Sequence, residues 1–102
     1  MLELRPNCEH CNIALPPASP LARTCSFECT FCADCVERVL FNVCQNCSGG
    51  FVPRPVRPAR AWVGEVSLAT RPASTTVKHK PVDATVHAAL RARLQGVPPG
   101  ER

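Results

Sequence analysis

Eight cysteines lie in the first half of this 102-residue chain, and their sulfur atoms are the groups best suited to chemistry. They form four close pairs: Cys8 and Cys11, Cys25 and Cys29, Cys32 and Cys35, and Cys44 and Cys47. Two residues separate the members of three pairs, and three residues separate Cys25 from Cys29. Such spacing lets both thiolates of a tight turn reach one tetrahedral ion at about 2.3 Å, so the sequence predicts two zinc sites.

Disulfides and iron are the two other chemistries that eight cysteines can support. A short secreted chain with this many cysteines would normally be held together by disulfides. Residues 1–6, however, include an acid and a proline, and no apolar stretch is long enough for a secretory signal or a membrane span. We therefore expect a cytoplasmic protein with metal-bound thiolates. Iron stays open as an alternative, because all-thiolate tetrahedral sites also accept it.

Charge is distributed unevenly along the chain, although the formal net charge is only +4. Residues 1–50 hold three arginines against five acidic residues, whereas residues 51–102 hold nine lysines or arginines against three. Metal-bound thiolates add further negative charge to the first half. The sequence therefore predicts an acidic head, residues 1–50, and a basic tail.

The tail is predicted to contain a flexible linker and one short helix. Residues 51–81 are rich in proline and arginine, which disfavours helix and central strand, so this linker is expected to be largely disordered. Residues 82–96 are a possible amphipathic helix, with Asp83 as its N-cap. Its apolar stripe would consist of Val86, Leu90 and Leu94. Residues 97–102 are expected to form a disordered terminus.

The head is predicted to be a small metal-stabilised α+β domain with one short helix over residues 33–41. Apolar residues recur there at helical spacing, while Asp34 and Arg38 form an exposed i,i+4 pair. The head is too short to fold on an apolar core alone. Structural zinc supplies roughly 10–16 kcal/mol per site, so we expect metal binding and folding to be one event.

The order and spacing of the cysteines resemble those of RING fingers. In that family, ligand pairs one and three bind one zinc ion and pairs two and four bind the other, which gives a cross-braced fold. The resemblance implies two sets of ligands: Cys8, Cys11, Cys32 and Cys35 for the first zinc, and Cys25, Cys29, Cys44 and Cys47 for the second. The chain departs from the RING pattern at Cys29, where RING fingers usually carry histidine.

A packing argument favours the same interleaved pairing over a local one. Residues 25–35 could hold one four-cysteine site by themselves, leaving the first and last pairs for the other. That arrangement leaves little room for a core. Interleaving instead ties both ends of the head across its middle and lets five apolar side chains pack between the ions: Phe27, Phe31, Val36, Val39 and Leu40. Because spacing alone does not fix connectivity, both pairings remain open.

A narrower resemblance covers residues 1–50 and stops near residue 58. Four runs carry it: MLELRPNC at residues 1–8, LPP at 15–17, CSFECTFC at 25–32 and VCQNC at 43–47. They are similar to a small bacterial family of cysteine-rich proteins known as domain of unknown function 1272. The resemblance implies a bacterial zinc module and no particular activity.

No catalytic pattern stands out, so we expect a non-enzymatic module that binds a protein partner, with no membrane and no small-molecule substrate. His10 is expected to face solvent, and His79 and His87 have no second ligand at metal spacing. Nucleic-acid binding by the basic tail is the main alternative. It would use the following residues: Arg54, Arg57, Arg60, Arg71, Lys78, Lys80, Arg91 and Arg93. Ubiquitin-ligase-like activity and redox sensing by the thiolates are further alternatives.

Overall fold

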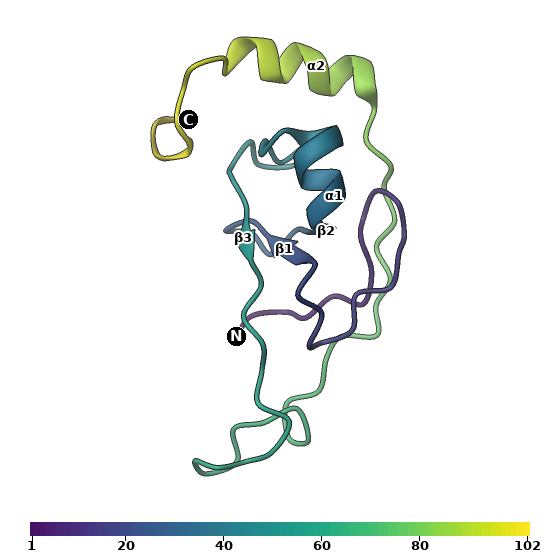
Figure 1. The fold of residues 1–102 in the computed structure, drawn as a ribbon, viewed down its shortest axis with the longest axis vertical. Helices are drawn as coiled ribbons and strands as arrows, with labels where there is room; N and C mark the ends of the chain where they lie inside the picture. Colours follow the sequence, from purple (N-terminus) through teal and green to yellow (C-terminus); the bar gives the residue numbers. More distant parts are fainter.

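A small antiparallel sheet lies at the centre of the computed structural model, which describes residues 1–102 (Figure 1). Its strands are β1 (Ala22–Thr24), β2 (Thr30–Cys32) and β3 (Val52–Pro53), in the order β2-β1-β3. Strands β1 and β2 form a hairpin, and β3 adds an edge from the start of the tail. An edge position suits Pro53, because proline has no N–H to donate to a further strand.

The turn of the hairpin is one of the cysteine pairs. Cys25 N donates to Cys29 O at 3.2 Å, and Glu28 adopts a left-handed backbone conformation with φ of 67°. The first pair forms a similar turn, in which Asn12 has φ of 65° and its N–H bonds Cys8 O at 2.9 Å. Asparagine tolerates this conformation well, so the first turn follows from the local sequence.

A helical segment follows β2 directly, as the sequence predicts for residues 33–41. It comprises α1 (Ala33–Cys35) and a wider π-helical turn, η1 (Val36–Leu40). Phe41 ends it in a left-handed conformation with φ of 48°. The helix brings Cys35 and Leu40 to the core, while Asp34 and Arg38 form their predicted exposed pair at 2.9 Å.

The core consists of cysteines and a few apolar side chains. Phe31 and Leu40 are fully buried, and the ring of Phe51 meets Phe31 edge-on at 5.5 Å. Val36 and Val39 are half-buried against this cluster. The prediction that Phe27 packs inside was wrong, since it is 71% exposed. Phe27 lies at the tip of the hairpin turn, where a side chain has no layer to pack against.

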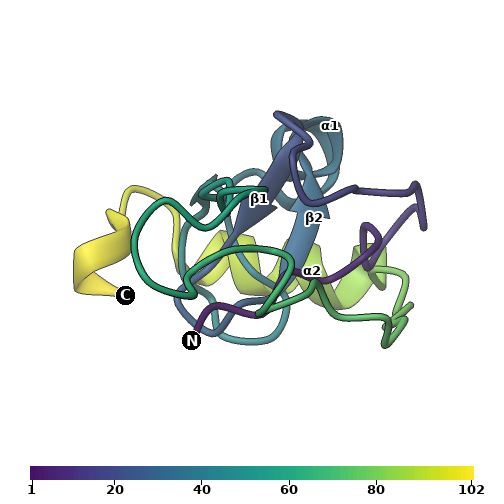
Figure 2. The same ribbon diagram turned by 90° about the horizontal axis from the view of Figure 1, so that it is seen from below.

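The tail runs back along the head instead of leaving it, so the predicted disorder is not confirmed. After β3, a loop at residues 58–71 lies at one end of the molecule and carries Trp62, which is 81% exposed (Figures 1 and 2). The chain then returns beside the head, where Ser74 N donates to Leu4 O at 3.0 Å. The proline-rich composition prevents regular structure here, but backbone groups at the rim of the head supply the missing hydrogen-bond partners.

Helix α2 (Ala84–Arg93) lies at the opposite end of the molecule from that loop, and a short 3-10 turn, η2 (Pro99–Glu101), follows it (Figure 1). The Asp83 carboxylate accepts from Thr85 N at 3.0 Å and Val86 N at 3.1 Å, as expected of an N-cap. Of the apolar stripe, Val86 is 67% exposed, and the buried residue of the helix is His87. None of the helices has the length and apolar character needed to cross a membrane.

Candidate metal centres

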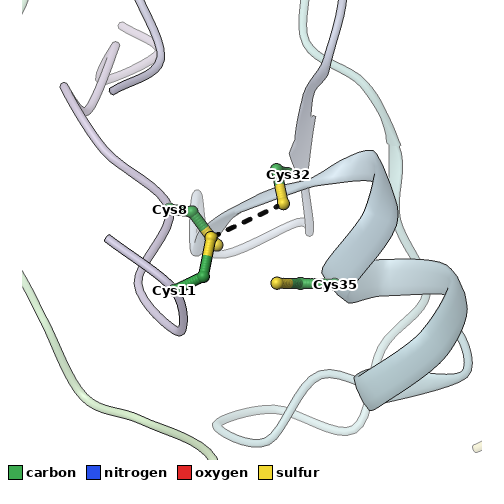
Figure 3. Close-up of side chains that lie close together, drawn as sticks. All are labelled: Cys8, Cys11, Cys32 and Cys35. Atoms are coloured by element: carbon green, nitrogen blue, oxygen red, sulfur yellow. Dashed lines mark hydrogen bonds between the residues drawn. The ribbon is translucent and has the colours of Figure 1, made fainter. Parts of the chain in front are cut away.

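Four cysteine sulfurs from two distant turns meet in the first candidate site. The sulfurs of Cys8, Cys11, Cys32 and Cys35 all lie within 4.8 Å of one another (Figure 3). Cys11 Sγ and Cys32 Sγ are 3.8 Å apart. A tetrahedral ion with 2.3 Å bonds to sulfur holds its ligands about 3.8 Å apart, so this donor set fits such an ion.

The surrounding elements explain how these side chains meet. The first turn is closed by Cys8 N bonding Ile13 O at 2.9 Å, which places Cys8 and Cys11 on one side of it. Cys32 is the last residue of β2, and Cys35 lies one helical turn further on. The hairpin and the helix therefore carry the third cysteine pair to the first one.

The second candidate site joins the second pair to the fourth. The sulfurs of Cys25, Cys44 and Cys47 lie within 4.8 Å of one another. Cys29 does not meet that distance to all three, but its buried sulfur accepts a hydrogen bond from Asn46 Nδ2 at 3.4 Å. Seven of the eight predicted residues therefore lie in two groups that follow the interleaved pairing, and the place of Cys29 in the second group stays a prediction.

Backbone N–H groups also point at the second group of sulfurs. Asn46 N donates to Cys44 Sγ and Gly49 N to Cys47 Sγ, both at 3.4 Å. The bonds from Cys44 and Asn46 outweigh burial and lower the pKa of Cys29 to about 5, whereas burial raises the pKa of Cys25 to about 11 and that of Cys35 further. A divalent cation would offset the cost of burying several thiolates together.

A buried ion pair fastens the first cysteine turn to β2, and sequence reasoning missed it. Glu9 Oε2 accepts from Arg5 Nη1 at 2.8 Å and from the backbone N of Thr30 at 2.5 Å. Burial lowers the pKa of Arg5, but its bonds to Glu3 and Glu9 outweigh that effect and raise it. The i,i+4 spacing of Arg5 and Glu9 was the one feature of the sequence that could have indicated this ion pair. Because the sequence places them in a loop, it did not indicate burial.

A segment of the tail, residues 78–82, crosses the first turn, and we call it the strap. Lys80 N donates to Glu9 O at 2.8 Å, and Val82 N donates to His10 Nδ1 at 2.9 Å. On the other side, Gln45 Nε2 donates to Lys80 O at 2.9 Å. The strap therefore touches both candidate sites. His10 is half-buried as a hydrogen-bond acceptor, so the expectation that it faces solvent was wrong.

Helix α2 is held next to the second site by His87. Its Nε2 donates to Val43 O at 2.8 Å, which fixes the tautomer because a carbonyl can only accept. Its Nδ1 then accepts Arg91 Nε at 3.2 Å, and the Arg91 guanidinium lies 4.2 Å from the centre of the Phe41 ring. No spacing rule in the sequence links His87 to Val43, since the contact depends on how the tail folds back.

A small α+β domain with two groups of clustered cysteines defines the class of cysteine-rich modules suited to metal binding. Within that class, residues 1–57 match the family described as "Protein of unknown function (DUF1272)", and the chain belongs to this family. An uncharacterized protein of Rhizobium meliloti (strain 1021) is 53% identical over 81 residues, covering 79% of this chain and 89% of that relative. No solved structure matches the chain, so its likeness to RING fingers remains a prediction.

The relative extends the similarity beyond the head. Its alignment of 81 residues is longer than the 57 residues that match the family, which start at the first residue. The similarity therefore reaches into the tail, further than the sequence motifs indicated. This agrees with a tail whose residues contact the head.

Proposed function

We propose that this protein is a non-enzymatic zinc module that acts as an adaptor between proteins in the cytoplasm. The observation that carries the proposal is the gathering of seven cysteines into two sulfur groups, with Cys29 bonded by Asn46 beside the second group. With four protein thiolates around one ion, no coordination position is left open for a substrate. Closed shells of this kind are typical of structural zinc.

Zinc is the metal that the donor chemistry favours. Four thiolates at tetrahedral spacing suit an ion with no geometric preference of its own. The second site gains from N–H groups aimed at its sulfurs, which stabilise thiolates within a buried site. Cys8, Cys11, Cys32 and Cys35 would hold one ion, and the remaining four cysteines would hold the other.

The adaptor role is supported by apolar side chains that the head leaves in solvent. Ile13, Leu21 and Phe27 are each about half or more exposed, at 49%, 51% and 71%. Ile13 and Phe27 belong to the cysteine turns, so metal binding would hold them rigidly. Rigid exposed apolar residues favour a protein partner, because little conformational entropy is lost on association.

Nucleic-acid binding has weaker support than the sequence indicated. The buried Arg54 donates to Arg5 O at 2.8 Å and Pro16 O at 3.1 Å, so its charge is used within the fold. Arg57 bonds Leu2 O at 2.7 Å. These residues are therefore committed to holding the tail on the head, which leaves a smaller and scattered set of cations for phosphates.

Native mass spectrometry of the freshly purified full chain tests the metal assignment. We expect two zinc ions per chain, and about one ion in Cys8→Ser. Ser26→Ala is the matched control, because Ser26 is an exposed neighbour of Cys25, and it should keep both ions. Iron in place of zinc, or an ordered chain without metal, would contradict the assignment.

Crosslinking in cells tests the adaptor role. Phe27→Ala should lose crosslinked protein partners while keeping both ions.

A further inference from the structure

The eight cysteines differ in their accessibility to reagents. Six are buried, Cys47 is half-buried, and Cys11 is exposed. Cys11 belongs to the first site, whose other three sulfurs are buried. A small oxidant in solution therefore meets one sulfur well before the rest. Zinc-bound thiolates remain nucleophilic, so exposure of this kind has chemical consequences.

The sulfurs around Cys11 also favour a second step after it is oxidised. Cys32 Sγ lies only 3.8 Å from Cys11 Sγ, close enough for a disulfide after a small side-chain movement. The sulfurs of the second site are buried or half-buried, and N–H groups bond Cys44 and Cys47. Such bonds withdraw charge from a thiolate and make it a weaker nucleophile.

We propose that the first site is a peroxide-sensitive metal site at which Cys11 is oxidised first and Cys32 completes a disulfide. The proposal rests on the proposed function, because it requires metal-bound thiolates. The second site is the stable one and keeps its ion under the same exposure. The oxidant is a hydroperoxide, which is small enough to reach the one exposed sulfur of the site.

The reaction balances as a two-electron oxidation. The Cys11 thiolate attacks the O–O bond of the hydroperoxide, which gives a sulfenic acid and a hydroxide or alkoxide leaving group. The Cys32 thiolate then attacks the Cys11 sulfur, forms the S–S bond and displaces hydroxide. Two thiolates are oxidised and hydrogen peroxide is reduced to two waters after protonation. A bound ion would keep only Cys8 and Cys35 as ligands at this site and would be released.

Metal loss at this site would free the strap. Four thiolates and one divalent ion carry a charge of about −2, and the strap with Lys78 and Lys80 is bonded to the same cysteine turn. Disulfide formation and protonation of the two remaining thiols would remove that negative charge. The turn that presents Glu9 O and His10 Nδ1 to the strap would also lose its metal support.

The test treats the zinc-loaded full chain with hydrogen peroxide. Zinc release is followed with a chromogenic chelator, and oxidised cysteines are mapped by differential alkylation. We expect one of the two ions to leave about tenfold faster than the other, together with oxidation of Cys11 and Cys32. Hydrogen exchange should show faster exchange at the amides of Lys80 and Val82, but not at Cys44 N, which bonds Gly49 O.

Two variants separate this site from the other. Cys11→His keeps a ligand for zinc and removes the oxidisable sulfur, so the fast phase should disappear. Cys47→His is the matched change in the second site and should leave the fast phase of zinc release unchanged. Two results would overturn this inference but not the proposed function. One is a fast phase of zinc release that persists in Cys11→His loaded with two ions, and the other is oxidation that begins at cysteines of the second site. If Cys11→His fails to load, the mapping of the unmodified chain decides. A chain that binds no zinc would overturn the proposed function as well.

Discussion

Arg5 and Glu9 form a buried ion pair, with Arg5 Nη1 2.8 Å from Glu9 Oε2 and both side chains less than a tenth exposed. The pair lies directly before and within the first cysteine turn, and Glu9 also accepts the N–H of Thr30 in β2. The position of this turn relative to the sheet therefore depends on this carboxylate together with the backbone bond from Glu9 N to Thr30 O at 3.0 Å. Buried charges of this kind are costly to separate.

Glu9→Gln should destabilise the zinc-loaded protein by about 3 kcal/mol, because it leaves the Arg5 charge with only Glu3 as a partner. Urea unfolding at saturating zinc measures the change. Asp34→Asn removes the exposed Arg38 pair and is the control, expected to cost less than about 1 kcal/mol. Equal effects of the two substitutions would contradict the role given to Glu9.

His87→Ala should release helix α2 from the head, because Val43 O would lose its donor and Arg91 its acceptor. An unsatisfied buried carbonyl costs about 1–3 kcal/mol. Limited trypsin digestion should then cut faster after Arg91 and Arg93. Val86→Ala changes an exposed residue on the same helix and should leave the cutting rate unchanged. Unaltered digestion of His87→Ala would show that the helix is held by other contacts.

Asp83→Ala should reduce the helicity of α2, since the carboxylate satisfies two backbone N–H groups at the start of the helix. The expected cost is about 1 kcal/mol of helix stability. Far-ultraviolet circular dichroism of the loaded chain measures it, and Asp83→Asn should retain most of the signal because asparagine also caps. Identical spectra for Asp83→Ala and the unmodified chain would count against the cap.

Removal of zinc by a chelator under reducing conditions should unfold the head. Each ion is expected to supply roughly 10–16 kcal/mol, more than the few buried apolar side chains can. Acidification should act in the same direction, because protons compete with the metal for thiolates. Circular dichroism and zinc content, followed together through a pH titration, should fall in parallel. Secondary structure that survives complete loss of metal would refute this coupling.

The sequence was sufficient to predict features fixed by local spacing. The helix after Cys32 and the Asp83 cap depend on residues a few positions apart, and the structure has both. The pairing of distant cysteines needed a packing argument as well, since spacing alone also allowed a local site at residues 25–35. In that case the need for a core between the sites indicated the arrangement that the structure shows.

Features that depend on the tail folding back were beyond sequence reasoning. The burial of His87 and Arg54 arises from contacts with Val43, Arg5 and Pro16, far away along the chain. Proline-rich composition predicts the lack of regular structure, and the segment indeed has little. Composition carries no information on whether backbone groups elsewhere will bond such a segment. The prediction that Phe27 is buried was wrong for a related reason, because hydrophobicity alone does not show that the turn carrying a residue points outward.

Strand β2 has consequences for how the two ions would load. Cys29 and Cys32 flank Thr30 and Phe31, so the predicted ligands of different sites are separated by only two fully buried strand residues. Fixing that strand through one ion positions a ligand for the other. By thermodynamic reciprocity, each ion then raises the affinity for its counterpart. Substoichiometric zinc should accordingly yield fewer singly filled chains than two independent sites would give.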